Sequence, residues 1–508
     1  MTVTLDGASL TIDDVVRVSR GYEHVALGDD AREKVRQCRT VLEELIGSRI
    51  IYGINTGFGA LSNITISPND LETLQTNLIR SHAAGVGPAL QKDITRAMML
   101  LRANTLAKGL SGVRLSTLET LVAMINARVH PIIPERGSVG ASGDLAPLAH
   151  LALVLMGEGE AEYLGQRMSG SEALKAASIA PAKLAAKEGV ALINGTQMMT
   201  AVGALMVHDA KRLVEYAERS GALSFDVLQG LMEAFDKRLH EARPHPGQIR
   251  SAEHMSQLLE GSKLVGFGEE RARRGFHRQD PYSLRCIPQV MGAARDAVDH
   301  ASRVIQVELN SANDNPLIFW EDRAVLSAGN FHGQPIALVL DLLAIALTTV
   351  GNLVERRIAR LLDPKLNLGL PPFLVPSPEK AGLSSGLMTS QYSAAALASE
   401  NKIFAHPASV DSIPTSADFE DFVSMGPAAA LKLTRVVENV QLLVAIEFLC
   451  GAQAAETRGV QNLSQANMKT HRAIRRVTPK LEEDKEISND ISRLAHSLSV
   501  DEFDAAIA

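Results

Sequence analysis

The sequence predicts a mainly α protein, in which a mixed N-terminal region is followed by a bundle of long helices. Apolar residues recur at helical spacing through the middle and the C-terminal part of the chain. Strand-like segments are few and short. A chain of 508 residues with 46% apolar and 21% charged residues can bury a large core. We therefore predict two domains, residues 1–200 and 201–508, because glycine-rich sequence gives way to long helices near residues 190–205.

The predicted strands all lie in the N-terminal region. Residues 2–5 and 49–52 are rich in β-branched and aromatic side chains, which is typical of short strands. Residues 161–167 resemble the edge of a hairpin, with a glycine at the turn.

The predicted helices have recognisable starts and stops. Ser67-Pro68 is a cap followed by proline, and apolar residues then recur at helical spacing to residue 82. Residues 116–119 fit a capping box that begins another helix. A long helix over residues 335–362 is stopped by the proline that follows, and a further long helix covers residues 433–451.

Charge and composition exclude several classes of partner. A net charge of −7 gives no basic footprint for nucleic acid, and the cluster of arginines at residues 271–278 has two glutamates beside it, which indicates a solvated face. The longest apolar run, residues 336–347, is interrupted by Asp341 and is too short to span a bilayer. Three widely spaced cysteines and no apparent signal peptide favour a cytoplasmic protein without disulfides.

The stretch at residues 137–148, GSVGASGDLAPL, has glycines at every third position and then an apolar run. This pattern predicts a tight loop that leads into a helix, with Asp144 as its cap and Pro147 in its first turn. The amide groups and the dipole of a helix N-terminus favour negative charge. An ordinary glycine-rich turn fits the same spacing, whereas a phosphate cradle fits less well because no Gly-Lys-Ser/Thr follows.

Within this loop, Ala141-Ser142-Gly143 resembles the signature of the aromatic amino acid ammonia-lyase family, and of its histidine-specific members in particular. In that family the tripeptide cyclises and loses water to form 4-methylideneimidazol-5-one (MIO), an electrophile built from the chain itself. The residue types suit this chemistry, because the nitrogen of Gly143 must approach the carbonyl of Ala141 and Ser142 supplies a hydroxyl that leaves as water. The resemblance implies no nucleotide or metal cofactor, and no two histidines have the spacing of a helical zinc motif.

A second glycine-rich segment, YGINTGFG at residues 52–59, resembles another element of the family. In the family its tyrosine, here Tyr52, is placed to act as the base that removes the β-proton of the substrate. A phenol is a weak base at neutral pH and needs a nearby donor or positive charge for this role. Without the resemblance, the segment is a turn with a packed tyrosine.

The pair Ser81-His82 resembles the residues that select the substrate in the family. Lyases that act on histidine tend to carry Ser-His at this place, those that act on tyrosine His-Leu, and those that act on phenylalanine Phe-Leu. A polar imidazole needs hydrogen-bond partners inside an apolar pocket, which is consistent with this trend. From periodicity alone, His82 would be a hydrogen-bonded histidine of the core.

Two further elements imply roles in holding the substrate. By the resemblance, Asn194 in the segment LINGT would bind the ring or the substrate carboxylate through its amide. Arg285 in the segment QDPYSLRC would clamp the carboxylate through a two-pronged contact. The same segment supplies two residues that would line the electrophile, Gln279 and Tyr282. Taken alone, the two segments fit a turn and a solvated surface arginine.

The last matching elements lie at residues 308–316, 329–332 and 405–416. By the resemblance, Phe331 would pack near the electrophile, and Glu420 would contact the imidazole or the amino group of the substrate. Around Glu420 the histidine lyases usually have ANQEDH, whereas this chain has ADFEDF. The differences concern one wall of the pocket and leave the exact substrate open; they lie at Asp418, Phe419 and Phe422.

The matches together run from residue 52 to 425 and imply an ammonia-lyase of histidine degradation, which converts L-histidine to trans-urocanate. A covalent electrophile would make the amine a better leaving group, whether it attacks the amine or the ring. The resemblance also implies an all-α architecture of the fumarase/aspartase kind and a homotetramer whose sites draw residues from three subunits. Three alternatives stay open: a tyrosine or phenylalanine lyase or aminomutase of the same family, a fumarase/aspartase-type lyase without MIO, and a non-catalytic helical scaffold.

Overall fold

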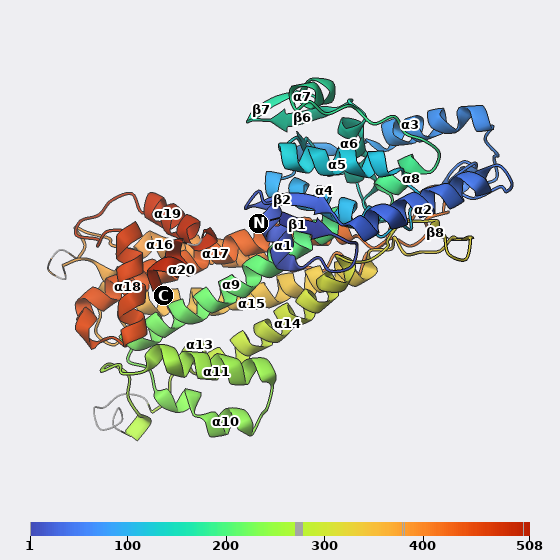
Figure 1. Cartoon of the computed structure of the whole chain (residues 1–508). Helices are drawn as coiled ribbons and strands as arrows, with labels where there is room; N and C mark the ends of the chain where they lie inside the picture. Colours follow the sequence, from blue (N-terminus) through green and yellow to red (C-terminus); the bar gives the residue numbers. More distant parts are fainter. Residues whose placement is uncertain (1, 270–277, 378, 380, 501, 508) are drawn as a thin grey trace. The chain divides into compact units, whose positions relative to one another are not determined.

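The computed structural model describes residues 2–269, 278–377, 379, 381–500 and 502–507, and helices make up most of it (Figure 1). The strands among these residues form only small sheets of two or three strands. The predicted mainly α class is therefore confirmed. Most of the arginine cluster, Arg271, Arg273 and Arg274, lies outside the described residues.

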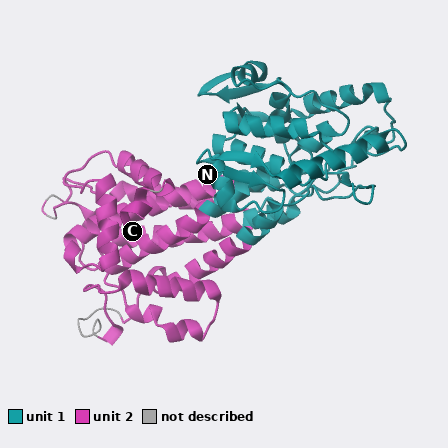
Figure 2. Ribbon diagram, viewed as in Figure 1, with its two compact units in different colours: residues 1–208, 301–341, 407–431 teal, residues 209–300, 342–406, 432–508 magenta. Residues whose placement is uncertain are grey.

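The chain divides into two compact units (Figure 2). Unit 1 comprises residues 1–208, 301–341 and 407–431, and unit 2 comprises residues 209–300, 342–406 and 432–508. This division differs from the predicted domains 1–200 and 201–508, because two later segments of the chain return to unit 1. Periodicity in the sequence locates helices but does not show which of them pack together.

The first 200 residues of unit 1 form short helices and all but one of the small sheets. Strand β1 pairs in parallel with β2, and β6 pairs with β7 in the predicted hairpin. The elements are β1 (Thr2–Leu5), α1 (Ile12–Ser19), β2 (His24–Leu27), α2 (Asp29–Ile46), α3 (Leu71–His82), β3 (Val86–Ala89), α4 (Lys92–Ala107), α5 (Leu115–Ala127), β4 (His130–Pro131), β5 (Pro134–Arg136), α6 (Leu145–Leu155), β6 (Glu160–Tyr163), β7 (Gln166–Ser169), α7 (Gly170–Ala176) and α8 (Glu188–Ile193).

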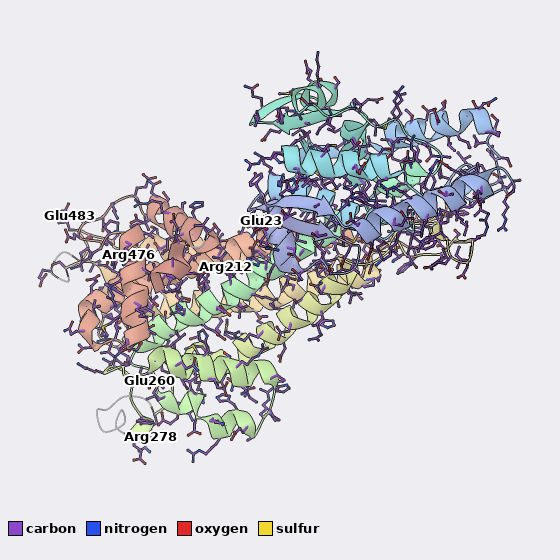
Figure 3. All side chains as sticks on the ribbon, viewed as in Figure 1. Glu23, Arg212, Glu260, Arg278, Arg476 and Glu483 are labelled. Atoms are coloured by element: carbon purple, nitrogen blue, oxygen red, sulfur yellow. The ribbon has the colours of Figure 1, made fainter. Side chains whose placement is uncertain are left out.

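Four long helices each contain a boundary between the units: α9 (Gln197–Val227), α14 (Ile287–Glu308), α15 (Gln334–Leu362) and α17 (Gly426–Arg458). The hairpin β8 (Leu317–Phe319) and β9 (Ala324–Leu326) belongs to unit 1. Unit 2 adds α10 (Lys237–Glu241), α11 (Pro246–Leu259), α13 (Tyr282–Arg285), α16 (Met388–Phe404), α18 (Gln465–Val477), α19 (Ser488–Ser499) and α20 (Glu502–Ile507). Within unit 2, the guanidinium of Arg212, labelled in Figure 3, donates to the Tyr216 hydroxyl on α9 and to Asp504 on α20.

Two local predictions are wrong, for the same physical reason. Residues 49–52 form a turn and not a strand, because the side chain of Asn55 accepts from the nitrogen of Ile51 at 2.7 Å and donates to the carbonyl of Arg49 at 2.8 Å. Helix α5 begins without the predicted capping box. The buried carboxylate of Glu188 accepts there from the Arg114 nitrogen at 2.8 Å and from the Thr117 hydroxyl at 2.6 Å. A side chain thus satisfies the backbone groups that a strand partner or a local cap would have served.

Helix α15 contains the apolar run at residues 336–347 and is long and apolar enough to cross a membrane, judged by length and composition. Of its most apolar window, however, 61% is buried inside the protein. This burial agrees with the predicted core helix.

A buried ion pair joins α15 to α17 in unit 2. The guanidinium of Arg357 contacts the carboxylate of Glu447 at 2.5 Å, and both side chains are fully buried. The hydroxyls of Ser220 and Ser224 each donate to this carboxylate at 2.6 Å. These hydrogen bonds offset the cost of removing two charges from water.

We expect Ser224→Ala to lower the free energy of unfolding by about 1.5–3 kcal/mol, because the buried carboxylate loses a charge-assisted hydrogen bond. The midpoint of urea unfolding measures this loss. Ser488→Ala is the matched control, since that hydroxyl is exposed and its removal should cost less than about 0.5 kcal/mol. Equal midpoints for the two variants would contradict the prediction.

Candidate active site

The loop that carries Ala141-Ser142-Gly143 leads into helix α6, as predicted. Its last glycine has a positive φ of 74°, in the left-handed region that favours glycine. A methyl group on Gly143 would lie 2.1 Å from the carbonyl oxygen of Gly195, which is too close for any side chain. The backbone of Gly195 therefore lies directly against the tripeptide.

Asp144 is fully buried. Contrary to the prediction, its side chain does not cap α6. Its carboxylate instead accepts from the nitrogens of Met198 and Met199, in the first turn of α9, at 2.8 and 3.0 Å. Its own nitrogen donates to the Gly195 carbonyl at 2.6 Å. Burial raises the pKa of the Asp144 carboxyl to about 7. Asp144 does cap a helix, but that helix is α9 and not α6. The sequence could not show this, because α6 and α9 meet only in the folded chain.

The segment 407–425 packs against the other side of the loop. The nitrogen of Met425 donates to the Val139 carbonyl at 2.9 Å. The hydroxyl of Ser142 donates to Glu420 at 3.1 Å, and Thr415 donates to the second oxygen of the same carboxylate at 2.8 Å. The structure thus brings together two predicted site residues that lie 278 positions apart.

The backbone just before Glu420 has an unusual conformation, and it includes one residue that differs from the family pattern, Asp418. Ser416, Ala417 and Asp418 all have positive φ, between 53° and 62°. The aromatic residues that follow are 58% exposed (Phe419) and 60% exposed (Phe422). Neither phenylalanine is therefore enclosed within unit 1.

Phe422 connects this segment to the loop that carries Phe331. Its ring stacks on His332, with 6.0 Å between the centroids and 16° between the planes. Its carbonyl oxygen also lies 3.2 Å from Nε2 of His332. Phe331 precedes this histidine and is half-buried. The non-matching residue Phe422 therefore holds two site loops together.

His82 ends helix α3, and its ring contacts a backbone acceptor. Nδ1 lies 2.9 Å from the Leu78 carbonyl, which can only accept, so Nδ1 carries the proton and Nε2 keeps a lone pair. Burial lowers the pKa of His82, although Leu78 and the negative charge of Glu420 oppose this shift. The imidazole is thus neutral at pH 7, and Glu420, which contacts Ser142, also acts on it. Ser81, at 3.0 Å from Nδ1, is exposed.

Tyr52 is half-buried in the turn that replaces the predicted strand. Its hydroxyl accepts from the nitrogen of Gly59 at 3.3 Å. A methyl group on Gly59 would lie 2.8 Å from the hydroxyl of Ser416, so this turn contacts the segment that carries Glu420. Tyr52 thus belongs to the same part of unit 1 as Ser142 and Glu420.

Asn194 follows α8 and immediately precedes the glycine that presses on the tripeptide. Its side chain hydrogen-bonds to a buried acid, Asp314, which forms an ion pair with Lys187 at 2.6 Å. Sequence reasoning missed both charged residues. The available signal was weak: Asp314 lies inside the matching segment 308–316 and Lys187 five residues before the segment LINGT, with nothing to show that the two would meet.

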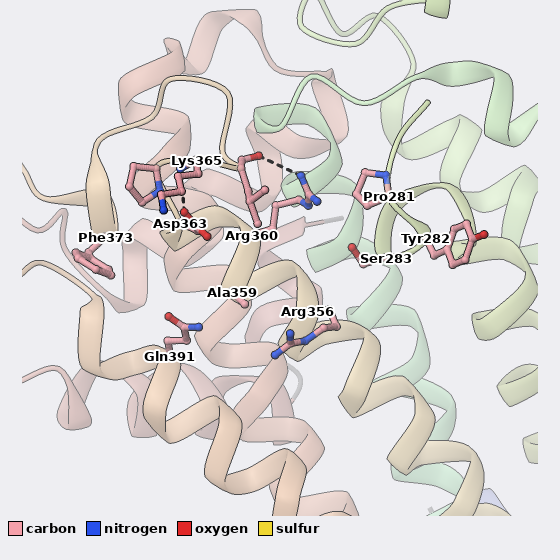
Figure 4. A pocket seen from close by; sticks show the side chains of 12 residues that line it. Pro281, Tyr282, Ser283, Arg356, Ala359, Arg360, Asp363, Lys365, Phe373 and Gln391 are labelled. Carbon is pink, nitrogen blue, oxygen red and sulfur yellow. Dashed lines mark hydrogen bonds between the residues drawn. The ribbon is translucent and has the colours of Figure 1, made fainter. Parts of the chain in front are cut away.

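Three predicted residues, Gln279, Tyr282 and Arg285, belong to unit 2, whereas all the other predicted site residues belong to unit 1. The guanidinium carbon of Arg285 lies 4.8 Å from the centroid of the Tyr282 ring. Tyr282 is 70% exposed and lines a cavity of about 710 Å³. Figure 4 shows Tyr282 and Ser283 on one side of this cavity, together with two arginines of α15, Arg356 and Arg360.

Among the described residues, no group of three or more His, Cys, Asp or Glu side chains is arranged to hold a metal ion. The three cysteines are free thiols, and Cys38 and Cys450 are buried. Burial raises the pKa of Cys38 to about 11, so its thiol stays protonated at neutral pH.

Comparison with known proteins agrees with the resemblance. A family model for aromatic amino acid lyases matches residues 10–476. The histidine ammonia-lyase of Alkaliphilus oremlandii is 50% identical over 507 residues, which cover 99% of this chain and 98% of that protein. The histidine ammonia-lyase of Caldanaerobacter subterraneus is 51% identical over 492 residues, which cover 96% of this chain and 95% of that protein.

Two solved structures are similar over the whole chain. The tyrosine aminomutase of Streptomyces globisporus superimposes with a TM-score of 0.96 at 41% identity, over 100% of this chain and 98% of that one. The histidine ammonia-lyase of Trypanosoma cruzi superimposes with a TM-score of 0.91 at 40% identity, over 100% of this chain and 95% of that one. Proteins with lyase and with aminomutase activity therefore share this fold, and only the site can distinguish between the two.

Proposed function

This chain belongs to the aromatic amino acid lyase family, and from that premise we propose that it removes ammonia from L-histidine to give trans-urocanate. The observation that carries the proposal is the cluster of Ser142, Glu420 and His82. The hydroxyl of Ser142 contacts Glu420, and the charge of Glu420 acts on the neutral ring of His82. An acceptor and a carboxylate beside the reactive loop suit a substrate whose side chain is an imidazole.

The residues of the loop fit the MIO group that the family implies. Gly143 has the conformation and the close approach that exclude a Cβ, and Ser142 has the hydroxyl that would leave. The group would be held by the loop itself and by the backbone of Gly195. Once formed, it would supply an electrophile that makes the amine a better leaving group.

The other residues would bind the substrate and move its proton. Nε2 of His82 would accept from the N–H of the substrate imidazole, and Glu420 would attract the positive charge of the ring or the amine. Tyr52 would take the β-proton, since its turn contacts the segment that carries Glu420.

By the resemblance, the carboxylate of the substrate would be held by Arg285, whose guanidinium lies beside the Tyr282 ring, and Gln279 precedes both in the same segment. We propose that the protein is a homotetramer and that a partner subunit contributes to each site. The 70% exposure of Tyr282, an aromatic residue with a proposed place in the site, supports this proposal.

Product analysis tests the reaction. Incubation with L-histidine should give urocanate and ammonia in equal amounts. The absorbance of urocanate measures the progress of the reaction. Faster formation of coumarate from tyrosine, or of cinnamate from phenylalanine, would overturn the choice of substrate. Formation of a β-amino acid without release of ammonia would instead indicate an aminomutase, the activity named for the similar Streptomyces structure.

We expect His82→Leu to raise the KM for histidine by about 10- to 100-fold, because the substrate imidazole loses its acceptor and a buried N–H stays unpaired. Because Nε2 of His82 is this acceptor, its protonation should make the KM for histidine depend on pH. Because burial lowers the pKa of His82 below about 6.5, Nε2 is free at neutral pH and becomes protonated only in acid. The KM of the wild type should therefore rise only as the pH falls below the range in which an ordinary histidine titrates.

Steady-state kinetics between pH 5 and 8 measure both effects. His150→Leu is a suitable control, since that ring lies in the same unit and accepts from the nitrogen of Gly85. It should leave the KM for histidine within a few-fold of the wild type. An unchanged KM in His82→Leu would exclude His82 as the residue that selects the substrate.

A further inference from the structure

Gly195 is the point at which the rest of unit 1 touches the reactive tripeptide most closely. Its carbonyl oxygen accepts from the nitrogen of Asp144 at 2.6 Å. The same oxygen would lie 2.1 Å from a methyl group on Gly143. The position of the Gly195 carbonyl therefore decides how the peptide bond between Gly143 and Asp144 is held.

The direction in which a side chain would project from Gly195 is closed as well. A methyl group there would lie 2.5 Å from Nη1 of Arg102, 2.6 Å from Oε1 of Gln197 and 2.7 Å from Oδ1 of Asn313. All three distances are shorter than a Cβ tolerates, so polar side chains pack directly against the Gly195 backbone.

Arg102, on helix α4, fastens the chain on both sides of Gly195. Its Nη1 donates to the Asn194 carbonyl at 2.9 Å and to Oε1 of Gln197 at 2.7 Å, and its Nη2 donates to the Ala191 carbonyl. The side chain is fully buried, and among the described residues its hydrogen-bond acceptors are amide oxygens and not carboxylates. Burying a guanidinium without an ion-pair partner is costly, so this arrangement is not explained by stability alone.

The network continues from Gln197 back to the residue after Gly195. Nε2 of Gln197 donates to Oδ1 of Asn313 at 2.8 Å. Nδ2 of Asn313 donates in turn to the hydroxyl of Thr196 at 2.8 Å and to Glu308 at 3.1 Å. The residues on either side of Gly195 are thus held by one connected set of buried side chains.

Ring formation requires that Gly143 stay close to Ala141. The Gly143 nitrogen must bond to the Ala141 carbonyl carbon, while its proton passes to the carbonyl oxygen. That oxygen then leaves as water with the proton of the Ser142 nitrogen, and the Ser142 hydroxyl leaves as a second water with the hydrogen on its own Cα. The attack is intramolecular, so its rate depends on how well the two reacting atoms are held together.

We propose that Arg102 is a positioning residue for this ring formation, which holds the Gly195 carbonyl against the tripeptide through the backbone on either side of it. With that carbonyl fixed, the Asp144 nitrogen that donates to it is fixed as well, and Gly143 cannot move away from Ala141. Gln197 and Asn313 complete the support. This role rests on the proposed function, because it requires that the tripeptide be converted.

A comparison of two buried arginines of the same helix tests this role. Arg102→Met removes the support of Gly195. Arg96→Met is the matched control, since Arg96 is also buried in α4 but donates to the carbonyls of Val18 and Ile125. The full-length chains are made by cell-free synthesis and sampled over time. The mass of the peptide that contains residues 141–143 gives the fraction that has lost two waters, and urea unfolding gives the stability of each variant.

We expect Arg102→Met to slow the loss of the two waters by about 10- to 100-fold, the effect of a small misplacement of reacting groups. Arg96→Met should keep this rate within a few-fold of the wild type, although it also loses a buried arginine. A wild-type rate in folded Arg102→Met would overturn the proposal. Equal slowing in the two variants would do so too, because the cause would then be a general loss of stability.

If Arg102→Met does not fold, Gln197→Leu carries the same test. It leaves Arg102 in place and removes the links to Arg102 and Asn313, so ring formation should again be slower, and a wild-type rate would contradict the role of the network. A folded wild type with an unmodified tripeptide would refute the proposed chemistry and this role together. A modified wild type that releases no urocanate would refute only the choice of histidine, since the mass is measured without any substrate.

Discussion

Ser142→Ala should lower the rate of urocanate formation by about three orders of magnitude or more, while the protein stays folded. Without the hydroxyl of Ser142 the chain cannot form the proposed electrophile, and only binding and positioning remain to accelerate the reaction. Folding should be little affected, because Ser142 is only half-buried and its one side-chain hydrogen bond goes to Glu420. The measurement combines steady-state kinetics with the mass of the peptide that contains residues 141–143.

The mass of this peptide tests the proposed chemistry more directly than the kinetics do. The wild-type peptide should lack two waters, and the peptide of Ser142→Ala should not show this loss. Ser138→Ala is the matched control, since its hydroxyl donates to the Gly143 carbonyl in the same loop but is not part of the tripeptide. That variant should keep the mass loss. An active wild type with an unmodified tripeptide would refute the proposed chemistry and favour a lyase of the fumarase/aspartase type.

The long helices could be predicted because their determinants lie within each helix. Helix α15 occupies 334–362 against a prediction of 335–362, since apolar spacing and the following proline define both ends. The capping of α5 could not be predicted in this way, because the acid that serves it, Glu188, lies on another helix. Local sequence predicts a helix, but it does not show which distant side chain satisfies its ends.

The site shows the same limit. The resemblance pointed to Ser142, His82 and Glu420, and in unit 1 Ser142 contacts Glu420, whose charge acts on His82. Nothing in the sequence indicated that Asp314 would meet Lys187 across 127 positions, because a buried ion pair has no local pattern. Motifs identify the groups that carry the chemistry, whereas the groups that orient them emerge only from packing.

Tyr52→Phe should lower kcat by about 10²- to 10⁴-fold, because the substrate loses the group that takes its β-proton. The change removes one oxygen and keeps the ring, so the packing of the turn at residues 52–59 should persist. The single hydrogen bond that is lost, from the nitrogen of Gly59, has a length of 3.3 Å and adds little to stability. Steady-state kinetics with histidine measure the effect.

Binding distinguishes a base from a residue that only shapes the pocket. If Tyr52 takes the proton, the affinity for urocanate should stay within a few-fold of the wild type while kcat falls, because the product has already lost the proton that Tyr52 removes. The tripeptide should still lose two waters, since Tyr52 is not part of it. Tyr163→Phe removes the hydroxyl of another half-buried tyrosine of unit 1, on strand β6, and should leave kcat unchanged. A Tyr52→Phe variant that loses affinity for urocanate but keeps its kcat would show that this tyrosine binds the ring, and the base would then have to be sought among the other acceptors near Glu420.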